Sequence, residues 1–225
     1  MSHNDFCKTY VAHGGTNLNK ERTMILLEGN ISAGKTTLGR ALAEEGRLAF
    51  LEEPVVQWQT GFARNLLADF YNDKDRWSFT FQIAAFITRA KTWDEILQKT
   101  DHSNVLLERS IYADRYIFAK NLRNSGYLSE AEWQIYSGLW DWLEQRWCSE
   151  PDKIIYLRTP AAICHQRLRL RGRGEEELVP LSYLQDIEKL HDEWLLGNPK
   201  VVVIDGSDTI ELSKVYEKAG IEEKF

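Results

Sequence analysis

The sequence predicts an α/β fold, a doubly wound parallel sheet of five strands with flanking helices. Five short apolar runs are separated by longer segments with helical spacing. Continuous apolar runs are typical of strands that are buried on both faces of a parallel sheet. A glycine-rich turn joins the first run to a helical pattern, as in a β-strand that leads into a crossover helix. Regular alternation of strands and helices favours parallel pairing with right-handed crossovers.

The five predicted strands are, in order, MILLEG (24–29), LAFLEE (48–53), NVLLER (104–109), KIIYLR (153–158) and VVVID (201–205). A helix over 36–45 follows the first strand, and the stretch 60–99 is long enough for two helices with a boundary near 73–77. Further helices are predicted over 111–124, 129–148, 160–171, 180–196 and after Asp208. Proline favours the first helical turn, which supports starts near Pro160 and Pro180.

Length and composition restrict the class of protein. The polar residues 1–22 read as a tail, and 23–225 as a single domain with a sizeable core. A net charge of -6 argues against a nucleic-acid-binding protein, and no apolar run reaches membrane-spanning length. Three irregularly spaced cysteines, Cys7, Cys148 and Cys164, suggest reduced thiols. We therefore expect a cytoplasmic protein that binds neither nucleic acid nor a membrane.

The turn after the first strand, GNISAGKT, matches the phosphate-loop pattern G-x-x-x-x-G-K-[ST] at every fixed position. Glycines let the backbone curl so that N–H groups point at phosphate oxygens, and the helix N-terminus adds positive potential. Lysine reaches the β and γ phosphates, and threonine offers a hydroxyl to Mg²⁺. The predicted triphosphate-binding residues here are Gly29, Asn30, Ile31, Ser32, Ala33, Gly34, Lys35, Thr36 and Thr37.

Charged residues follow the second and third predicted strands, at the edge where ligands of such sheets bind. Glu53 is placed to accept a proton from a substrate hydroxyl, and Glu108 with Arg109 could orient Mg²⁺ and hold phosphate oxygens. Taken alone, Glu53 is equally well a solvated loop acid, and the pair a salt bridge at the rim. Their shared position beside a phosphate loop favours the functional interpretation.

Arginines recur at alternate positions in RLRLRGRGEEELVP, at 167, 169, 171 and 173. One interpretation is a solvated helix end that complements the helix dipole. The other is a lid that closes over the site, with Gly172 and Gly174 as hinges and arginines that neutralise charge on a transferring phosphoryl group. A local cationic cluster in an acidic chain favours the lid.

Gln82 is a single amide in the aromatic stretch FYNDKDRWSFTFQIAAF. A buried amide needs hydrogen-bond partners. A nucleobase edge would supply a donor and an acceptor together, whereas the alternative is a glutamine bonded to backbone.

Six segments resemble the deoxynucleoside kinases of the deoxycytidine and deoxyguanosine kinase type, from about Thr23 onward. They are EGNISAGKTTL, EPVVQW, RWSFTFQ, ERSIYADRYIFAKNL, LRGRGEEELVPLSYL and HDEWLL. The resemblance implies a P-loop kinase fold with an arginine-rich lid. It also implies phosphorylation of a deoxynucleoside 5′-hydroxyl by ATP, with Mg²⁺ as cofactor, in nucleotide salvage.

The resemblance also implies roles for single residues. Glu53 matches the base at the 5′-hydroxyl, Arg109 its partner, and Glu108 a magnesium-site acid, with the choice of proton acceptor between the two glutamates left open. Magnesium would be held by Thr36 and Glu108. The remaining matches are Tyr71 and Glu176 for the sugar 3′-hydroxyl, Gln82 for the base edge, Trp58, Phe81 and Phe118 for aromatic walls, Arg167, Arg171 and Arg173 for the lid, and Asp208, Thr209 and Ile210 for the donor-base loop.

Base preference follows from one charged pair. Arg89 and Asp114 resemble the pair in the base pocket of the deoxycytidine and deoxyguanosine enzymes, where thymidine-accepting relatives have smaller uncharged groups. This pair favours deoxycytidine or a purine deoxynucleoside over thymidine. Two features depart from the family pattern: FQIAAF after the glutamine, and a shortened segment after HDEWLL that bears on the choice of donor.

Two alternatives belong to other functional classes. A nucleoside monophosphate kinase of the thymidylate kinase type shares the loop and lid, but Glu53 would repel an acceptor phosphate. A nucleotide switch or catalytically silent subunit is the second, although no N-K-x-D motif is present and the catalytic candidates are all retained. The family forms dimers through long helices, and Trp133, Trp140, Trp142 and Trp147 on one helical segment suggest a homodimer face, or else core packing.

Overall fold

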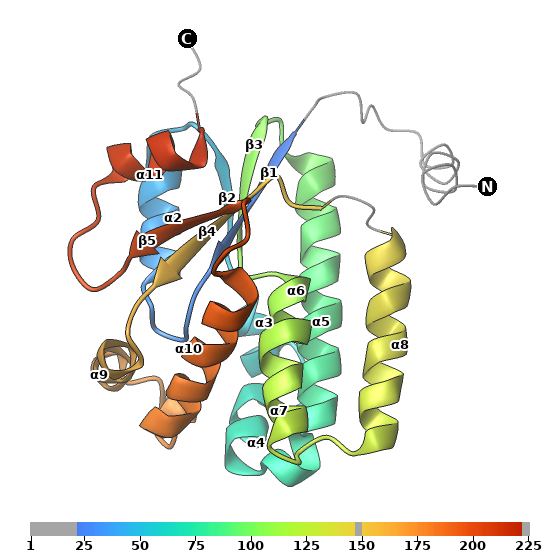
Figure 1. The fold of residues 1–225 in the computed structure, drawn as a ribbon. Helices are drawn as coiled ribbons and strands as arrows, with labels where there is room; N and C mark the ends of the chain where they lie inside the picture. Colours follow the sequence, from blue (N-terminus) through green and yellow to red (C-terminus); the bar gives the residue numbers. More distant parts are fainter. Residues whose placement is uncertain (1–21, 147–149, 222–225) are drawn as a thin grey trace.

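The sheet has five parallel strands in the order β2-β3-β1-β4-β5. A computed structural model describes residues 22–146 and 150–221 (Figure 1). The strands are β1 (Thr23–Glu28), β2 (Ala49–Leu51), β3 (Asn104–Glu108), β4 (Lys153–Arg158) and β5 (Val201–Asp205). All five predicted strands are confirmed. The central position of β1 puts the phosphate loop, which follows it, in the middle of the sheet's carboxyl edge.

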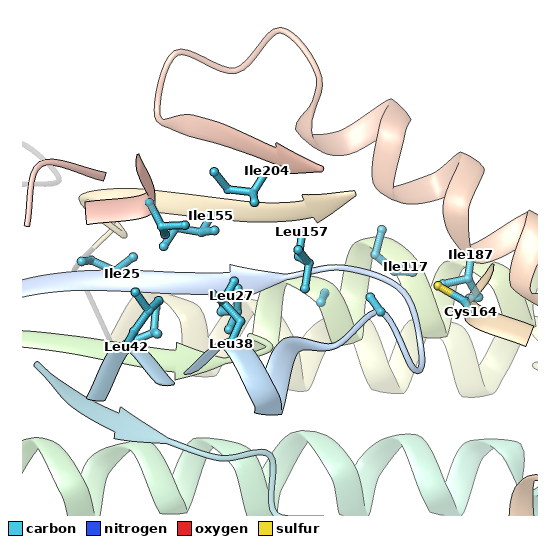
Figure 2. Close-up of a cluster of buried hydrophobic side chains, with 14 of the residues drawn as sticks. Ile25, Leu27, Leu38, Leu42, Ile117, Ile155, Leu157, Cys164, Ile187 and Ile204 are labelled. Atoms are coloured by element: carbon cyan, nitrogen blue, oxygen red, sulfur yellow. The ribbon is translucent and has the colours of Figure 1, made fainter. Parts of the chain in front are cut away.

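Both faces of the sheet are covered, as the continuous apolar runs predict. Along β1 the side chains alternate: Ile25 and Leu27 enter one core cluster, and Leu26 enters the other. Figure 2 shows Leu38 and Leu42 of the first crossover helix packed beneath the first of these faces. The second face packs against the helices of residues 55–146. The sheet is therefore a rigid, two-sided support for its carboxyl edge.

Five predicted helices are confirmed, three of them within a residue or two at both ends; α8 agrees at its start, and α11 follows Asp208 as expected. They are α2 (Lys35–Glu44), α8 (Glu130–Arg146), α9 (Ala161–Arg171), α10 (Leu181–Leu195) and α11 (Leu212–Ala219). Pro160 and Pro180 lie at the N-cap positions of α9 and α10. Gly172 ends α9 in the left-handed region at φ 63°, where glycine is favoured because it has no Cβ.

The prediction of two helices over 60–99 is confirmed, and a third short helix that was not predicted lies just before them, from residue 55. The three are α3 (Val55–Thr60), α4 (Leu66–Asn72) and α5 (Lys74–Lys99). The predicted boundary near Asp73 is confirmed, since its side chain caps α5 by accepting from the Arg76 amide. The short helix α3 begins with two β-branched residues, Val55 and Val56, whose low helix propensity gives no sequence signal for a helix. Burial of its Trp58 stabilises it.

The segment 111–124 is helical but not one regular α-helix. A short α6 (Ile111–Ala113) leads into a π-helix, η2 (Asp114–Ala119), and then into α7 (Lys120–Asn124). Single π turns are frequent at functional sites, because the wider turn changes the direction of the side chains it carries. The π turn here carries Asp114 and Phe118. The spacing of apolar residues in the sequence gives no signal for this wider turn.

The structure divides the tryptophans of α8 between the two interpretations. Trp140 is buried and Trp133 packs against the core, because helical rotation turns both inward. Trp142 is exposed, together with Ile135 and Leu139. Trp147, Cys7 and Cys148 lie outside the described residues, whereas Cys164 is a buried free thiol. Among the described helices, none is both long and apolar enough to cross a membrane.

Candidate active site

One cavity of about 560 Å³ opens at the carboxyl ends of β1, β2 and β3. Its walls come from the phosphate loop, α3, α4, α5, η2, the end of α9 with the turn after it, and Tyr183 of α10. Predicted site residues that line it are Ile31, Ser32, Ala33, Gly34, Lys35, Thr36, Thr37, Glu53, Trp58, Tyr71, Phe81, Gln82, Arg89, Glu108, Arg109, Asp114, Phe118, Arg167, Arg171, Arg173 and Glu176. The fold therefore brings together residues that are more than 140 positions apart in the sequence.

The phosphate loop has the conformation its glycines allow. Gly29 has φ +153°, and a Cβ there would lie 2.5 Å from the Leu157 carbonyl oxygen, so any side chain would collide with β4. Gly34 has φ +105° and begins α2. The Lys35 ammonium donates to the carbonyls of Gly29 (3.2 Å) and Asn30 (2.8 Å). It therefore lies folded into the loop, where burial lowers its pKa to about 8, an effect that Arg109 adds to.

Thr36 and Glu108 meet at the entrance of α2. The threonine hydroxyl lies 2.9 Å from each carboxylate oxygen of Glu108. Hydroxyl and carboxylate oxygens are the donors that Mg²⁺ prefers, usually as one or two protein ligands beside phosphate oxygens and waters. The two side chains therefore fit a shared magnesium ion, and no cluster of three or more His, Cys, Asp or Glu that could hold a metal exists in the described chain.

Glu53 joins two arginines in the middle of the cavity. Its Oε1 accepts from Nη2 of Arg89 at 2.9 Å and lies 3.0 Å from Nε of Arg109. Burial alone would raise the pKa of Glu53, but Arg109, Arg89 and Lys35 outweigh it and lower this pKa to about 2. Glu53 is thus ionised throughout the physiological pH range, and its Oε1 is held by both arginines.

Arg109 has a strained backbone. Its φ is +63°, a value that is rare for a residue with a side chain. Residues with such strained backbones occur most often at functional sites. The guanidinium lies 4.5 Å over the Phe118 ring, and its Nη1 is buried without a hydrogen-bond partner among the described residues. A cation held with an unused donor at a cavity wall is suited to bind an anion or an oxygen atom.

The deeper part of the cavity combines a charged pair with an amide. Nε of Arg89 donates to Asp114 Oδ2 at 2.9 Å, and both side chains are buried. Gln82 lies two turns earlier on α5, and its Oε1 is also buried without a partner in the described part of the chain. Buried polar atoms normally have partners. This amide therefore has a hydrogen-bond acceptor available for a bound ligand.

Aromatic rings form the wall around these polar groups. Trp58 and Phe81 meet edge to face with centroids 5.5 Å apart, and Phe81 stacks on Phe70 at 4.7 Å. The Trp58 indole N–H donates to the Thr88 hydroxyl at 2.8 Å, which fixes the ring. Flat apolar walls with a few polar groups are typical of a site for a planar ring.

Two arginines of α9 and one that follows it line the cavity. Arg167 donates from Nη1 to the Ala33 carbonyl at 3.0 Å, directly on the phosphate loop. Arg171 and Arg173 form ion pairs with Glu176, the latter at 2.9 Å. Burial, with Tyr183 and the buried Glu176, raises the pKa of Tyr71 well above its usual range. Tyr71 and Glu176 both line the cavity and are available to the same ligand.

Some predicted residues do not line the cavity. Gly29 and Asn30 shape the loop from behind, where Asn30 donates to the Leu184 carbonyl at 2.8 Å. Asp208 and Thr209 are exposed and Ile210 packs on the core, so they contribute no wall, although Arg167 contacts the preceding Ser207 carbonyl at 3.3 Å. Their donor-base role remains a prediction.

Several lining residues were missed by the sequence reasoning: Arg40, Glu52, Val55, Val56, Gln59, Leu67, Phe70, Ala85 and Tyr183. Helical spacing contains a signal for some. Ala85 lies between Gln82 and Arg89 on one stripe of α5, and Leu67 shares a face with Tyr71 on α4. Gln59 had no such signal, because α3 itself was not predicted.

The cavity therefore has two chemically different ends. One end presents backbone amides, Lys35 and arginines to an anion. The other presents aromatic rings, an amide and a buried charged pair to a planar polar ring. Glu53 lies between them. This arrangement can bind a phosphate donor and a neutral acceptor together, with a carboxylate at the point where they meet.

Comparison with known proteins agrees with this geometry. The family model described as deoxynucleoside kinase matches residues 25–223. A probable deoxycytidine kinase of fowlpox virus is 39% identical over 192 residues, covering 85% of this chain and 80% of the viral protein. Deoxycytidine kinase 2 of Gallus gallus is 34% identical over 250 residues (96% and 94%), and human mitochondrial thymidine kinase 2 is 37% identical over 177 residues (79% and 66%). A match over almost the whole described chain, with these relatives, shows that the chain belongs to the deoxynucleoside kinase family and is a kinase of nucleosides.

Proposed function

We propose that this kinase transfers the γ-phosphoryl group of ATP to the 5′-hydroxyl of a deoxynucleoside, preferring deoxycytidine or a purine deoxynucleoside to thymidine. The observation that carries the proposal is the position of Glu53 between the phosphate loop and the aromatic end, on two arginines. A carboxylate there accepts a hydrogen bond from a neutral hydroxyl and repels an acceptor phosphate. This favours a nucleoside over a monophosphate as acceptor.

The low pKa of Glu53 bears on its role. A carboxylate with a pKa of about 2 is a weak base, so it does not deprotonate a free alcohol. It orients the 5′-hydroxyl in line with the γ-phosphorus and accepts the proton late, when bonding to phosphorus has made that oxygen acidic. Phosphoryl transfer proceeds through a loose transition state, so positioning and charge stabilisation dominate catalysis.

The hydrogen-bond partner of Glu108 favours a role in metal binding rather than in proton transfer. Both of its carboxylate oxygens accept from the Thr36 hydroxyl, and together these groups would hold Mg²⁺ beside the triphosphate. When bound, the metal neutralises charge on the β and γ phosphates. Lys35 and Arg167 lie on the loop to bind the same oxygens, whereas Arg171 and Arg173 would leave Glu176 for the transferring group when the lid closes.

The base preference rests on the Arg89–Asp114 pair and Gln82. Gln82 would accept from and donate to the base edge, and the pair would present a donor and an acceptor beside it. Thymine carries a 5-methyl group in place of a hydrogen, so a charged pair next to the ring leaves a poor apolar contact for it. Relatives include enzymes named deoxycytidine kinase and enzymes named thymidine kinase, so the preference is tested by experiment rather than by similarity.

The test is a Glu53→Gln variant assayed with saturating ATP and deoxynucleoside. We expect kcat to fall at least about a hundredfold, within the usual range for general acid–base groups, with smaller changes in either KM. Glu95→Gln is the control, because this exposed carboxylate on α5 pairs with Lys91 and does not line the cavity. Turnover of Glu53→Gln near that of wild type would refute the assignment.

We further propose that the protein is a homodimer formed through α8. Its exposed Ile135, Leu139 and Trp142 lie at i, i+4 and i+7, on one stripe of a helix that packs along α5. A continuous apolar stripe favours burial against another surface. Sedimentation of Leu139→Glu beside wild type tests this: a dimer that becomes a monomer supports it, and a wild-type monomer contradicts it.

A further inference from the structure

Two adjacent glutamates in the turn after α9 point in different directions. The turn is η3 (Gly174–Glu176). Glu176 is buried and binds the two lid arginines. Glu175 instead bonds to side chains of α3 and of the N-cap of α4, the helix against which η3 packs. Its position was not singled out by the sequence, and nothing in the phosphoryl-transfer chemistry described above uses it.

Glu175 is held by two amide side chains from distant parts of the chain. Its Oε1 accepts from Gln59 Nε2 at 2.9 Å and from Asn65 Nδ2 at 2.8 Å. The Asn65 side chain has a second bond, because its Oδ1 caps α4 by accepting from the Ala68 amide at 3.0 Å. These bonds lower the pKa of Glu175, Asn65 being the main cause, so the carboxylate form is the one that is bound.

Each partner belongs to an element that forms the acceptor end of the cavity. Gln59 follows Trp58 on α3, and Asn65 begins the helix α4 that carries Tyr71. Glu175 therefore ties the turn that carries Glu176 to both of these elements. The connection runs to the walls of the acceptor site and not to the phosphate loop.

This connection matters because two glycines, Gly172 and Gly174, lie just before Glu175 in the turn. Gly172 ends α9 in the left-handed conformation, and a Cβ at Gly172 or Gly174 would meet no atom within 4 Å. Arg171 and Arg173 therefore flank the glycine hinge, and closure of the lid would swing them toward the phosphates. Glu176 lies two residues past Gly174. Without a fixed point it would move with the arginines.

We propose that Glu175 is a positioning residue that anchors η3 to α3 and α4, so that Glu176 stays beside Tyr71 to bind the sugar 3′-hydroxyl while the lid arginines move. This inference rests on the proposed role of Tyr71 and Glu176. In the ligand-free protein Glu176 holds Arg171 and Arg173, and on closure it exchanges them for the 3′-hydroxyl. Glu175 keeps its two amide partners in both states.

The experiment compares a deoxynucleoside with its 2′,3′-dideoxy analogue, which lacks only the 3′-hydroxyl, in the full-length enzyme. Wild type should prefer the deoxynucleoside in kcat/KM. In Glu175→Ala we expect this preference to fall about tenfold, mostly through a higher KM for the deoxynucleoside, with little change for the analogue. Glu175→Gln keeps an acceptor oxygen for both amides, and should restore most of the preference.

Controls separate the anchor from charge and from folding. Glu177→Ala removes an exposed acid two positions from Glu175 and should keep the preference. Gln59→Ala removes one of the two donors and should give a smaller loss of the same kind, which keeps the test valid if Glu175→Ala folds poorly. Thermal melting checks each variant.

The outcomes separate two failures. A wild-type enzyme with no preference for the 3′-hydroxyl would refute the role of Tyr71 and Glu176, and this inference with it. A wild-type preference that Glu175→Ala retains in full would refute only the anchor. An equal loss in Glu177→Ala would show a charge effect and also overturn it.

Discussion

Arg89 and Asp114 form an ion pair of 2.9 Å in which only 2% and 3% of the side chains are exposed. The pair lies on the acceptor side of the cavity, between α5 and the π turn. Arg89 has a second carboxylate, Glu53, at 2.9 Å, whereas Asp114 has no other cation within ion-pair distance in the described chain. The two members therefore depend on each other unequally, and this asymmetry can be measured.

Removing one member should destabilise the fold more than removing both. Arg89→Met leaves the buried Asp114 without its cation, whereas Glu53 keeps Arg109, and we expect a loss of about 3–5 kcal/mol in the free energy of unfolding. Asp114→Ala should cost less, because Glu53 still neutralises Arg89. The double variant should be more stable than the sum of the single losses by about 1–3 kcal/mol. Urea unfolding measures this, and additive losses would contradict the dependence.

The Thr36–Glu108 contact predicts a specific magnesium phenotype. Glu108→Gln should raise the Mg²⁺ concentration for half-maximal activity by about tenfold or more, because a neutral amide is a weaker ligand than a carboxylate. The KM for the deoxynucleoside should change little. Thr36→Val should act in the same direction, and Thr36→Ser, which keeps the hydroxyl, should act much less. An unchanged Mg²⁺ requirement in Glu108→Gln would remove Glu108 from the metal site.

The unpartnered oxygen of Gln82 predicts a binding effect. Gln82→Ala should raise the deoxynucleoside KM by about 10- to 100-fold, the cost of one or two lost hydrogen bonds to a desolvated base. The kcat should stay within a few fold, since the amide is remote from Glu53 chemistry. Gln134→Ala, an exposed amide on α8, is the control. A change confined to kcat would show that Gln82 does not read the base.

His191 predicts a pH dependence of stability. It is fully buried and donates from Nδ1 to the Ile187 carbonyl at 2.7 Å, and burial lowers its pKa from 6.5 to about 3. Between pH 6.5 and 3, His191 is therefore protonated in the unfolded chain but neutral in the folded chain. Below pH 6.5 this histidine should cost up to about 1.4 kcal/mol of stability for each pH unit down to pH 3.

His191→Asn keeps a donor near the Nδ1 position but does not titrate. Glu28 acts in the opposite direction, because burial raises its pKa to about 7, so lowering the pH from 7 to 4.5 favours the fold. The difference between variant and wild type therefore isolates His191. The free energies of unfolding of wild type and variant should lie closer together at pH 5.5 than at pH 7, or the variant should become the more stable of the two at pH 5.5. A difference independent of pH would contradict the assignment.

Sequence patterns could predict the sheet because a buried parallel strand is read from one run of apolar residues. The phosphate loop could be predicted because its glycines have a steric reason at fixed positions, as the Leu157 contact of Gly29 shows. Ligand edges of such sheets are also known, so Glu53 and Arg109 could be placed together. These conclusions depend on local chemistry and one topological rule.

The parts that could not be predicted depend on packing or on local departures from regular helices. Helix α3 is stabilised by burial of Trp58 rather than by propensity. The π turn at Asp114 has the composition of an ordinary helix. The inward rotation of Trp140 depends on how α8 lies against its neighbours. The role of Glu175 depends on two amides 116 and 110 residues away, which no local pattern records.

The most direct test of the proposed acceptor is kcat/KM with Mg·ATP on the four natural deoxynucleosides, with dTMP as a competing acceptor. The charged pair and Glu53 predict that deoxycytidine or a purine deoxynucleoside is the best substrate, that thymidine is poorer, and that dTMP is not phosphorylated. Thymidine as best substrate would contradict the pocket formed by Arg89 and Asp114. Activity on dTMP alone would contradict a neutral hydroxyl acceptor at Glu53.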